Sequence, residues 1–185
     1  YEYLNASGLR TKVKTPDGRL EETRYDAQMN PVEVRRDGRV VASLTYHPDG
    51  LVKTIRDESG PERRFTYDDA GRLQVIQTAP GREVRTDYDA QGRRVRLTDP
   101  AGGSATWTYD AQGRLVTAAD STGATTRYAY DDAGHLAEVT SPEGLVTRME
   151  RDQAGRITAL TGPDGGVTRY QHDAAGRLVK IRHPG

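Results

Sequence analysis

Glycine recurs every 21 residues through most of the chain, and this period constrains the fold more than any other feature of the sequence. Ten residues behind this first glycine series runs a second one, which includes Gly102, Gly123 and Gly144. A period of this length is typical of arrays in which one small structural unit stacks on the next. The first series defines the glycine column: Gly8, Gly50, Gly71, Gly92, Gly113, Gly134, Gly155 and Gly176, with Met29 in the place between the first two.

The same period orders the aromatic and aliphatic residues. Four residues before each glycine lies the tyrosine column, Tyr25, Tyr46, Tyr67, Tyr88, Tyr109 and Tyr130, which ends in Arg151 and His172. Six residues before each glycine lies the aromatic column, Phe65, Trp107, Tyr128 and Tyr170, with Leu44 and Met149 as apolar replacements. The position five residues after the glycine is apolar in all nine 21-residue repeats. Only 34% of residues are apolar, a composition that disordered chains share, but a disordered chain has no reason to keep such a register.

The sequence of each 21-residue repeat predicts two short strands and two tight turns. The first turn reads Asp-x-x-Gly, in which Asp bonds backbone amides ahead of it and Gly takes a left-handed conformation. The second turn often carries proline at its second position, as in Ser141-Pro142-Glu143-Gly144. Between the turns lie runs of Thr, Val, Tyr and Arg that favour strands. The first turns define the aspartate column: Asp68, Asp89, Asp110, Asp131, Asp152 and Asp173, with Asp26 in the N-terminal part.

The prediction is an all-β protein, a continuous antiparallel meander of hairpins with about seventeen strands and a stub at Tyr1. We expect one array over residues 1–185, degenerate over 1–50 and regular over 51–185, without a second domain. Twisted sheets of this many strands generally curl or close, which predicts a spiral or a shell wall. One point stays open. The apolar positions two and five after glycine, such as Leu73 and Ile76, have opposite parity, so either a bulge reconciles them or both faces are partly covered.

Composition excludes several functions. The 27 basic and 27 acidic residues cancel, which argues against a nucleic-acid partner. The absence of cysteine excludes disulfides and thiol nucleophiles, no apolar run is long enough for a membrane helix, and no targeting signal is evident. The four histidines fall in different places of the repeat, and no catalytic triad, phosphate loop or zinc motif is found. We therefore expect no enzyme activity, no cofactor and no metal, since successive members of the aspartate column lie too far apart to share a calcium ion.

An arginine directly follows the glycine of the column in five repeats. We interpret this arginine column as closing its hairpin on the aspartate and covering an aromatic ring, because the planar guanidinium suits both. Its members are Arg72, Arg93, Arg114, Arg156 and Arg177.

The heptapeptides Tyr67–Leu73 and Tyr109–Leu115 resemble the YD repeat of the RHS family, and near-copies begin at 88, 130, 151 and 172. The resemblance implies a β-sheet strip that spirals into a hollow shell, which encloses a C-terminal toxin in bacterial polymorphic toxins and insecticidal toxin complexes and serves adhesion in animal teneurins. It also implies a structural, non-catalytic fragment, secreted or on the surface of a bacterium, whose partners are the rest of the shell and an enclosed toxin. The resemblance further implies that members which release a toxin carry an additional C-terminal segment with a self-cleaving aspartate. Asp99-Pro100 lies in an ordinary second turn and does not match that site.

An alternative is a carbohydrate-binding or adhesion module. Aromatic repeats of similar length form such modules, and Phe65, Trp107, Tyr128 and Tyr170 are the candidate ligand-facing residues. Asn5-Ala6-Ser7 is a short, weakly specific glycosylation sequon. Bare edge strands at the two ends of a sheet would further allow edge-to-edge self-association.

Overall fold

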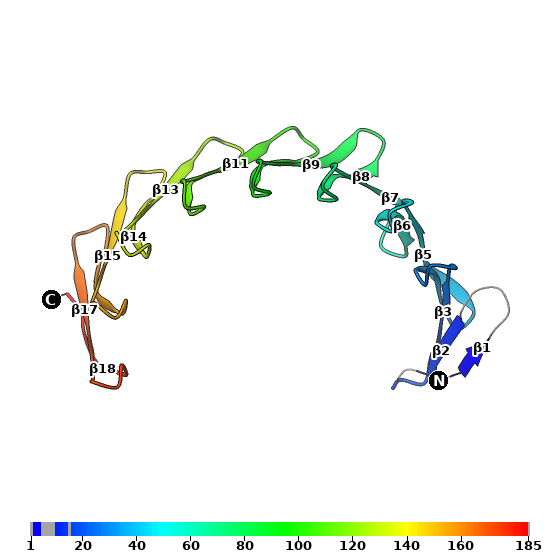
Figure 1. Ribbon diagram of the computed structural model, residues 1–185, viewed down its shortest axis with the longest axis horizontal. Coiled ribbons are helices and arrows are strands. Elements are labelled where there is room, and N and C mark those ends of the chain that lie inside the picture. The colour runs from blue at the N-terminus through cyan, green and yellow to red at the C-terminus, as the bar shows by residue number, and fades with distance from the viewer. Residues whose placement is uncertain (1, 5–9, 15, 185) are drawn as a thin grey trace. The chain divides into compact units, whose positions relative to one another are not determined.

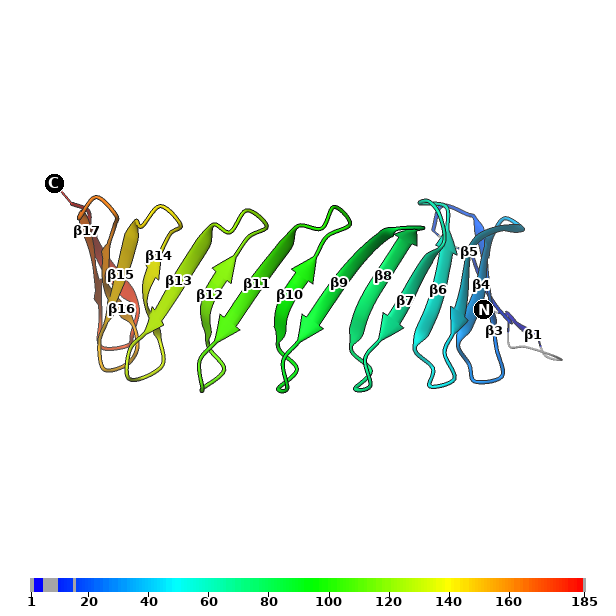
Figure 2. The same cartoon turned by 90° about the horizontal axis from the view of Figure 1, so that it is seen from above.

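The computed structural model describes residues 2–4, 10–14 and 16–184, and every regular element in these ranges is a β-strand (Figure 1, Figure 2). The all-β antiparallel prediction is therefore confirmed. The sequon Asn5–Ser7, together with Tyr1 and Gly8, lies outside the described residues. The strands are β1 Glu2–Leu4, β2 Arg10–Lys14, β3 Leu20–Tyr25, β4 Pro31–Arg36, β5 Arg39–Tyr46, β6 Val52–Asp57, β7 Arg63–Tyr67, β8 Leu73–Ala79, β9 Arg82–Tyr88, β10 Arg94–Thr98, β11 Ser104–Tyr109, β12 Leu115–Ala119, β13 Thr125–Tyr130, β14 Leu136–Thr140, β15 Val146–Arg151, β16 Ile157–Thr161, β17 Val167–His172 and β18 Leu178–Arg182.

The chain divides into two units, residues 1–87 with 98–102 and residues 88–97 with 103–185. In the first unit, each strand from β1 to β8 pairs antiparallel with the strand that follows it. In the second unit, the same holds for each strand from β11 to β17. Each unit is thus a meander of hairpins. None of the described residues forms a helix long and apolar enough to cross a membrane.

The turns explain why the chain reverses where it does. In the turn after β7, the Gly71 amide donates to the Asp68 carbonyl at 2.9 Å and the Asp68 amide donates to the Arg72 carbonyl at 2.9 Å. Gly71 has a φ of 75°, a left-handed conformation that costs an ordinary L-residue free energy but not glycine. The pattern recurs at each later glycine of the column, so the same four-residue signal ends each outgoing strand.

A β-bulge reconciles the two apolar positions of opposite parity. In the hairpin of β7 and β8, Tyr67 is opposite Leu73 while Thr66 is opposite Val75, which leaves Gln74 as an extra residue. Leu73 and Ile76 therefore both lie across from residues of the tyrosine and aromatic columns. The structure thus selects the bulge, one of the two arrangements that the sequence left open. The same register shift precedes Tyr25, Tyr46, Tyr109, Tyr130, Arg151 and His172.

Each sheet is a single layer with little interior. Among the residues whose burial is described, only Ala159 is buried, with 1% of its surface exposed. In β7 and β13 the residues of the tyrosine and aromatic columns are half-buried and their neighbours are exposed, as alternation along a strand requires. We name the side that bears these two columns the tyrosine face and the opposite side the polar face.

Candidate functional site

The first turn of five regular repeats is closed by an aspartate and an arginine, and in a sixth, at Asp131, His135 takes the place of the arginine. Asp110 Oδ1 accepts hydrogen bonds from the amides of Gln112 and Arg114, at 3.0 and 2.8 Å. Its Oδ2 accepts from Arg114 Nε at 2.7 Å. One carboxylate therefore holds the turn and fixes the direction of the guanidinium. The same bond to Arg Nε or Nη2 closes the turns at Asp68, Asp89, Asp152 and Asp173.

These bonds shift the acidity of the aspartates. The pKa of Asp68 is lowered first by the hydrogen bond from the Arg72 amide and then, against a smaller effect of burial, by the Arg72 side chain. The pKa of Asp152 is lowered first by its bond with the Arg156 side chain. Hydrogen bonds to the ionised form favour that form, so these carboxylates carry their charge at neutral pH.

The arginine also reaches the next repeat along the chain. The Arg93 guanidinium carbon lies 4.6 Å from the ring centroid of Tyr109, and its Nη1 donates to the Asp110 carbonyl at 3.4 Å. Arg114 lies over Tyr130 at the same distance. A Cβ atom added to Gly113 would meet Arg93 Nη1 at 3.5 Å. The guanidinium thus occupies a slot bounded by the tyrosine ring and the glycine of the following turn.

The tyrosine hydroxyls connect repeats in the opposite direction. Tyr130 donates to the Leu115 carbonyl at 2.9 Å, a residue 15 positions earlier. Tyr46, Tyr67 and Tyr109 donate in the same way to the carbonyls of Pro31, Val52 and Arg94. Tyr25 and Tyr88 occupy the same place at the ends of β3 and β9 and are half-buried. Tyrosine therefore serves in this column for its hydroxyl as well as for its ring.

The aromatic column does not converge on one site. Its members Phe65, Trp107, Tyr128 and Tyr170 are half-buried on β7, β11, β13 and β17, one in each hairpin. Each lies across from an apolar residue: Ile76, Ala118, Val139 and Ile181. The Arg94 guanidinium lies 5.6 Å from the Trp107 ring centre. Among the described residues, no three His, Asp or Glu side chains gather into a group able to hold a metal ion.

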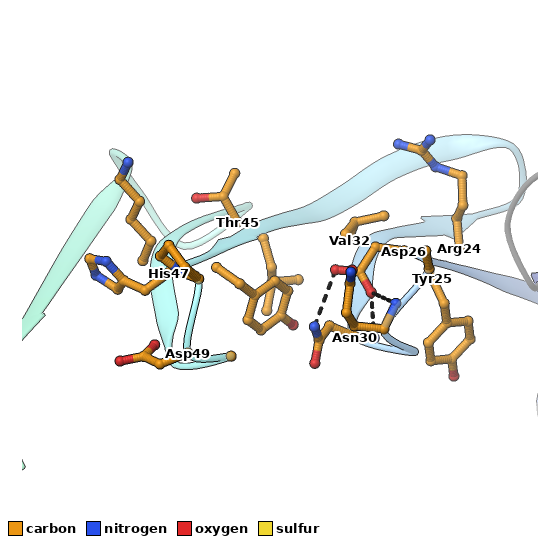
Figure 3. A pocket seen from close by; sticks show the side chains of 15 residues that line it. Arg24, Tyr25, Asp26, Asn30, Val32, Thr45, His47 and Asp49 are labelled. Atoms are coloured by element: carbon orange, nitrogen blue, oxygen red, sulfur yellow. Dashed lines mark hydrogen bonds between the residues drawn. The ribbon is translucent and has the colours of Figure 1, made fainter. Parts of the chain in front are cut away.

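One hollow, which the sequence analysis missed, lies where the repeat is irregular. Its volume is about 1250 Å³, and it lies in the first unit (Figure 3). Asn30, Tyr46 and Gly50 line it together with Asp26 and His47. The sequence did carry a signal, because Asn30 stands where five of the regular repeats have their arginine. His47, in the aspartate column, instead contacts the next repeat, with its ring edge-on to Tyr67 and its Nε2 3.1 Å from the Phe65 carbonyl oxygen.

Comparison with known proteins places these repeats in a family. The model of the RHS repeat matches six overlapping segments, residues 46–84, 75–105, 88–125, 109–146, 130–167 and 151–185. No curated protein matches the chain. The crystal structure of TcdB2-TccC3-TEV is similar in fold, with 15% identity and a TM-score of 0.65 over 95% of this chain and 10% of that one.

Two further solved structures match with lower TM-scores. The crystal structure of TcdB2-TccC3 is 16% identical with a TM-score of 0.48, over 95% of this chain and 13% of that one. A Tc holotoxin pore of Photorhabdus luminescens is 14% identical with a TM-score of 0.35, over 95% of this chain and 14% of that one. The chain thus spans 10–14% of the length of these solved chains. The repeated matches over residues 46–185 establish that the chain belongs to the RHS-repeat family.

Proposed function

We propose that this chain is a non-catalytic wall segment of an RHS-type shell that encloses another polypeptide, such as a C-terminal toxin, and that the shell is secreted or displayed by a bacterium. The observation that carries the proposal is the single layer of sheet, in which only Ala159 is buried among the residues with described burial. A layer of this kind leaves two usable faces, as a wall requires. Membership of the RHS-repeat family supports the same function.

The proposed mechanism is physical separation. Neighbouring strands of a sheet lie about 4.8 Å apart and are joined by backbone hydrogen bonds, so no polypeptide passes between them. In the second unit, the Tyr130 hydroxyl and the Arg114 guanidinium link one hairpin to the next. In the first unit, the Tyr67 hydroxyl makes the corresponding link to the Val52 carbonyl. The wall therefore needs no second layer of structure to stay closed between repeats.

Electron microscopy of the natural polypeptide that carries this array tests the proposal. We expect a closed shell with density inside, and an enclosed segment that resists protease until the shell is denatured. The matched control is the same polypeptide with the enclosed segment deleted, which keeps the shell and loses the internal density. An open sheet with no enclosed density would contradict encapsulation.

A second function, binding of carbohydrate to the tyrosine face, is favoured by one observation. The aromatic column is half-buried and not fully covered, and partly accessible aromatic rings offer surfaces on which sugars stack. Its members are Phe65, Trp107, Tyr128 and Tyr170. A glycan array followed by calorimetry would detect this binding. Tyr128→Leu should abolish it, whereas Arg127→Ala on the polar face should not. Absence of saturable binding to any glycan would exclude this function.

A further inference from the structure

The hollow of the first unit coincides with a slot that the regular repeats fill from within. At Gly113, Gly134 and Gly176 an added Cβ would meet a guanidinium nitrogen of the preceding repeat at 3.4–3.5 Å. At Gly50 the same construction meets nothing within 4 Å, and Gly50 lines the hollow. The difference follows from Asn30, which is too short to reach the next turn.

The slot in the first unit is lined by the same two groups that contact the arginine in the regular repeats, a tyrosine ring and an aspartate carboxylate. Tyr46 presents its ring, and its hydroxyl is held on the Pro31 carbonyl at 2.8 Å. Asp26 Oδ1 accepts from the amides of Gln28 and Asn30, and its Oδ2 accepts from Asn30 Nδ2 at 3.2 Å. A carboxylate has about four acceptor positions, so Oδ2 can accept a further donor. The bonds between Asp26 and Asn30 are drawn in Figure 3.

The pKa directions show a charged carboxylate whose field reaches the Tyr46 hydroxyl. The pKa of Asp26 is lowered, first by the hydrogen bond from the Asn30 amide. The pKa of Tyr46 is raised, first by burial and then by the charge of Asp26. Asp49, Arg24 and Lys53 also line the hollow, so its two carboxylates balance two cations. Arg24 points away from Asp26 and Asn30 (Figure 3), which leaves selection to the ring and the carboxylate.

We propose that this hollow, defined by Asp26, Asn30, Tyr46 and Gly50, binds a guanidinium group presented by an arginine side chain of another polypeptide segment. The bound group takes the place that Arg93 takes over Tyr109 and Arg114 over Tyr130. The planar guanidinium stacks on the ring and donates to the carboxylate, whereas an ammonium group is a compact point charge that cannot do both in one plane. The proposal holds whether or not the array encloses a toxin.

Titration of the intact chain with N-acetyl-arginine methylamide tests the proposal, with the NMR signals of ¹³C-labelled tyrosine as the readout. We expect the Tyr46 signal to shift with a dissociation constant on the order of a millimolar, and the lysine analogue to bind at least tenfold more weakly. Asn30→Arg supplies the group from within the chain and should abolish the shift. That substitution restores the pattern of the regular repeats, so the variant should fold.

A reciprocal variant provides the matched control. Arg114→Asn opens the equivalent slot over Tyr130 and should create a second binding event of similar strength. Equal binding of the arginine and lysine probes would overturn the selectivity for guanidinium, as would binding that survives Asn30→Arg. A response to methylguanidinium with none to the arginine probe would overturn the assignment of a polypeptide ligand.

Discussion

At the scale of single residues, the aspartate, glycine and arginine of Asp-x-x-Gly-Arg each have a different role in the turn. Asp68 accepts the amides of Ala70 and Arg72 on one oxygen and Arg72 Nε on the other. Gly71 supplies the left-handed backbone, and Arg72 places a positive charge beside the carboxylate. The turn is thus fixed by hydrogen bonds that require an ionised aspartate.

This chemistry predicts a loss of stability in acid. The folded-state pKa of Asp68, Asp152 and Asp173 lies below the unfolded value. Such groups contribute stability above the unfolded pKa, about 4, and this contribution is lost as pH falls through the lower folded pKa. We expect the urea midpoint to fall steadily below about pH 4.

Two neighbouring acids provide the test. Asp68→Asn should lower the urea midpoint at pH 7 and make its decline in acid less steep. Asp69→Asn, at the exposed adjacent position, should change neither. An Asp68→Asn variant with the pH profile of the parent would show that the turn does not depend on the carboxylate charge.

Met29 gives a second prediction at this scale. It stands in the glycine column with a φ of 68°, and a left-handed conformation costs a residue with a side chain roughly 1–2 kcal/mol. Met29→Gly should therefore raise the free energy of unfolding by about 1 kcal/mol, measured by urea denaturation. Met29→Ala removes the long side chain but keeps the Cβ atom, so it should not stabilise the chain; an equal gain in both variants would point to the side chain instead.

At the scale of strands and hairpins, the bulge and the tyrosine hydroxyl act together. The bulge places Leu136 opposite Tyr130 and Val139 opposite Tyr128, so ring and aliphatic side chains share the tyrosine face. The hydroxyl of Tyr130 then bonds the Leu115 carbonyl of the previous hairpin. Packing within a hairpin and hydrogen bonding between hairpins thus use the same residue.

Removal of that hydroxyl should measure the link between hairpins. Tyr130→Phe leaves a half-buried carbonyl without its donor, and we expect a loss of about 1 kcal/mol in unfolding free energy. Tyr128→Phe is the matched control, because no hydrogen bond of the Tyr128 hydroxyl is found within the described part of the chain. If the two variants lose the same stability, the hydroxyl bond contributes nothing specific.

At the scale of the whole molecule, the sheet has faces but almost no interior. All five residues of β18 are exposed, and Leu178, Val179 and Ile181 have 50%, 61% and 45% of their surface accessible. An exposed apolar strand at a sheet edge is a template for pairing with another chain. The solubility of the isolated chain therefore depends on whether β18 pairs with another strand.

We expect concentration-dependent self-association of the isolated chain through β18. Sedimentation velocity should show the sedimentation coefficient rising with concentration, and Val179→Lys with Ile181→Lys should suppress the rise. Leu145→Lys alters an equally exposed apolar residue in the turn after β14 and should leave association unchanged. A monomer at every concentration would refute this prediction.

The sequence by itself determined the order of strands and turns and the family, because Asp-x-x-Gly turns are local signals and the 21-residue period aligns them. It also determined which residues share a column. The structure decided the bulge before Tyr67. The bulge depends on which residues of two neighbouring strands lie opposite each other, and the 21-residue period alone does not fix that register. The structure also decided the links from Tyr130 to Leu115 and the hollow beside Gly50. The Tyr130 hydroxyl reaches a carbonyl of the neighbouring repeat, whereas Asn30 does not reach the turn at Gly50. The distance between a side chain and the next repeat is set only when the hairpins lie side by side.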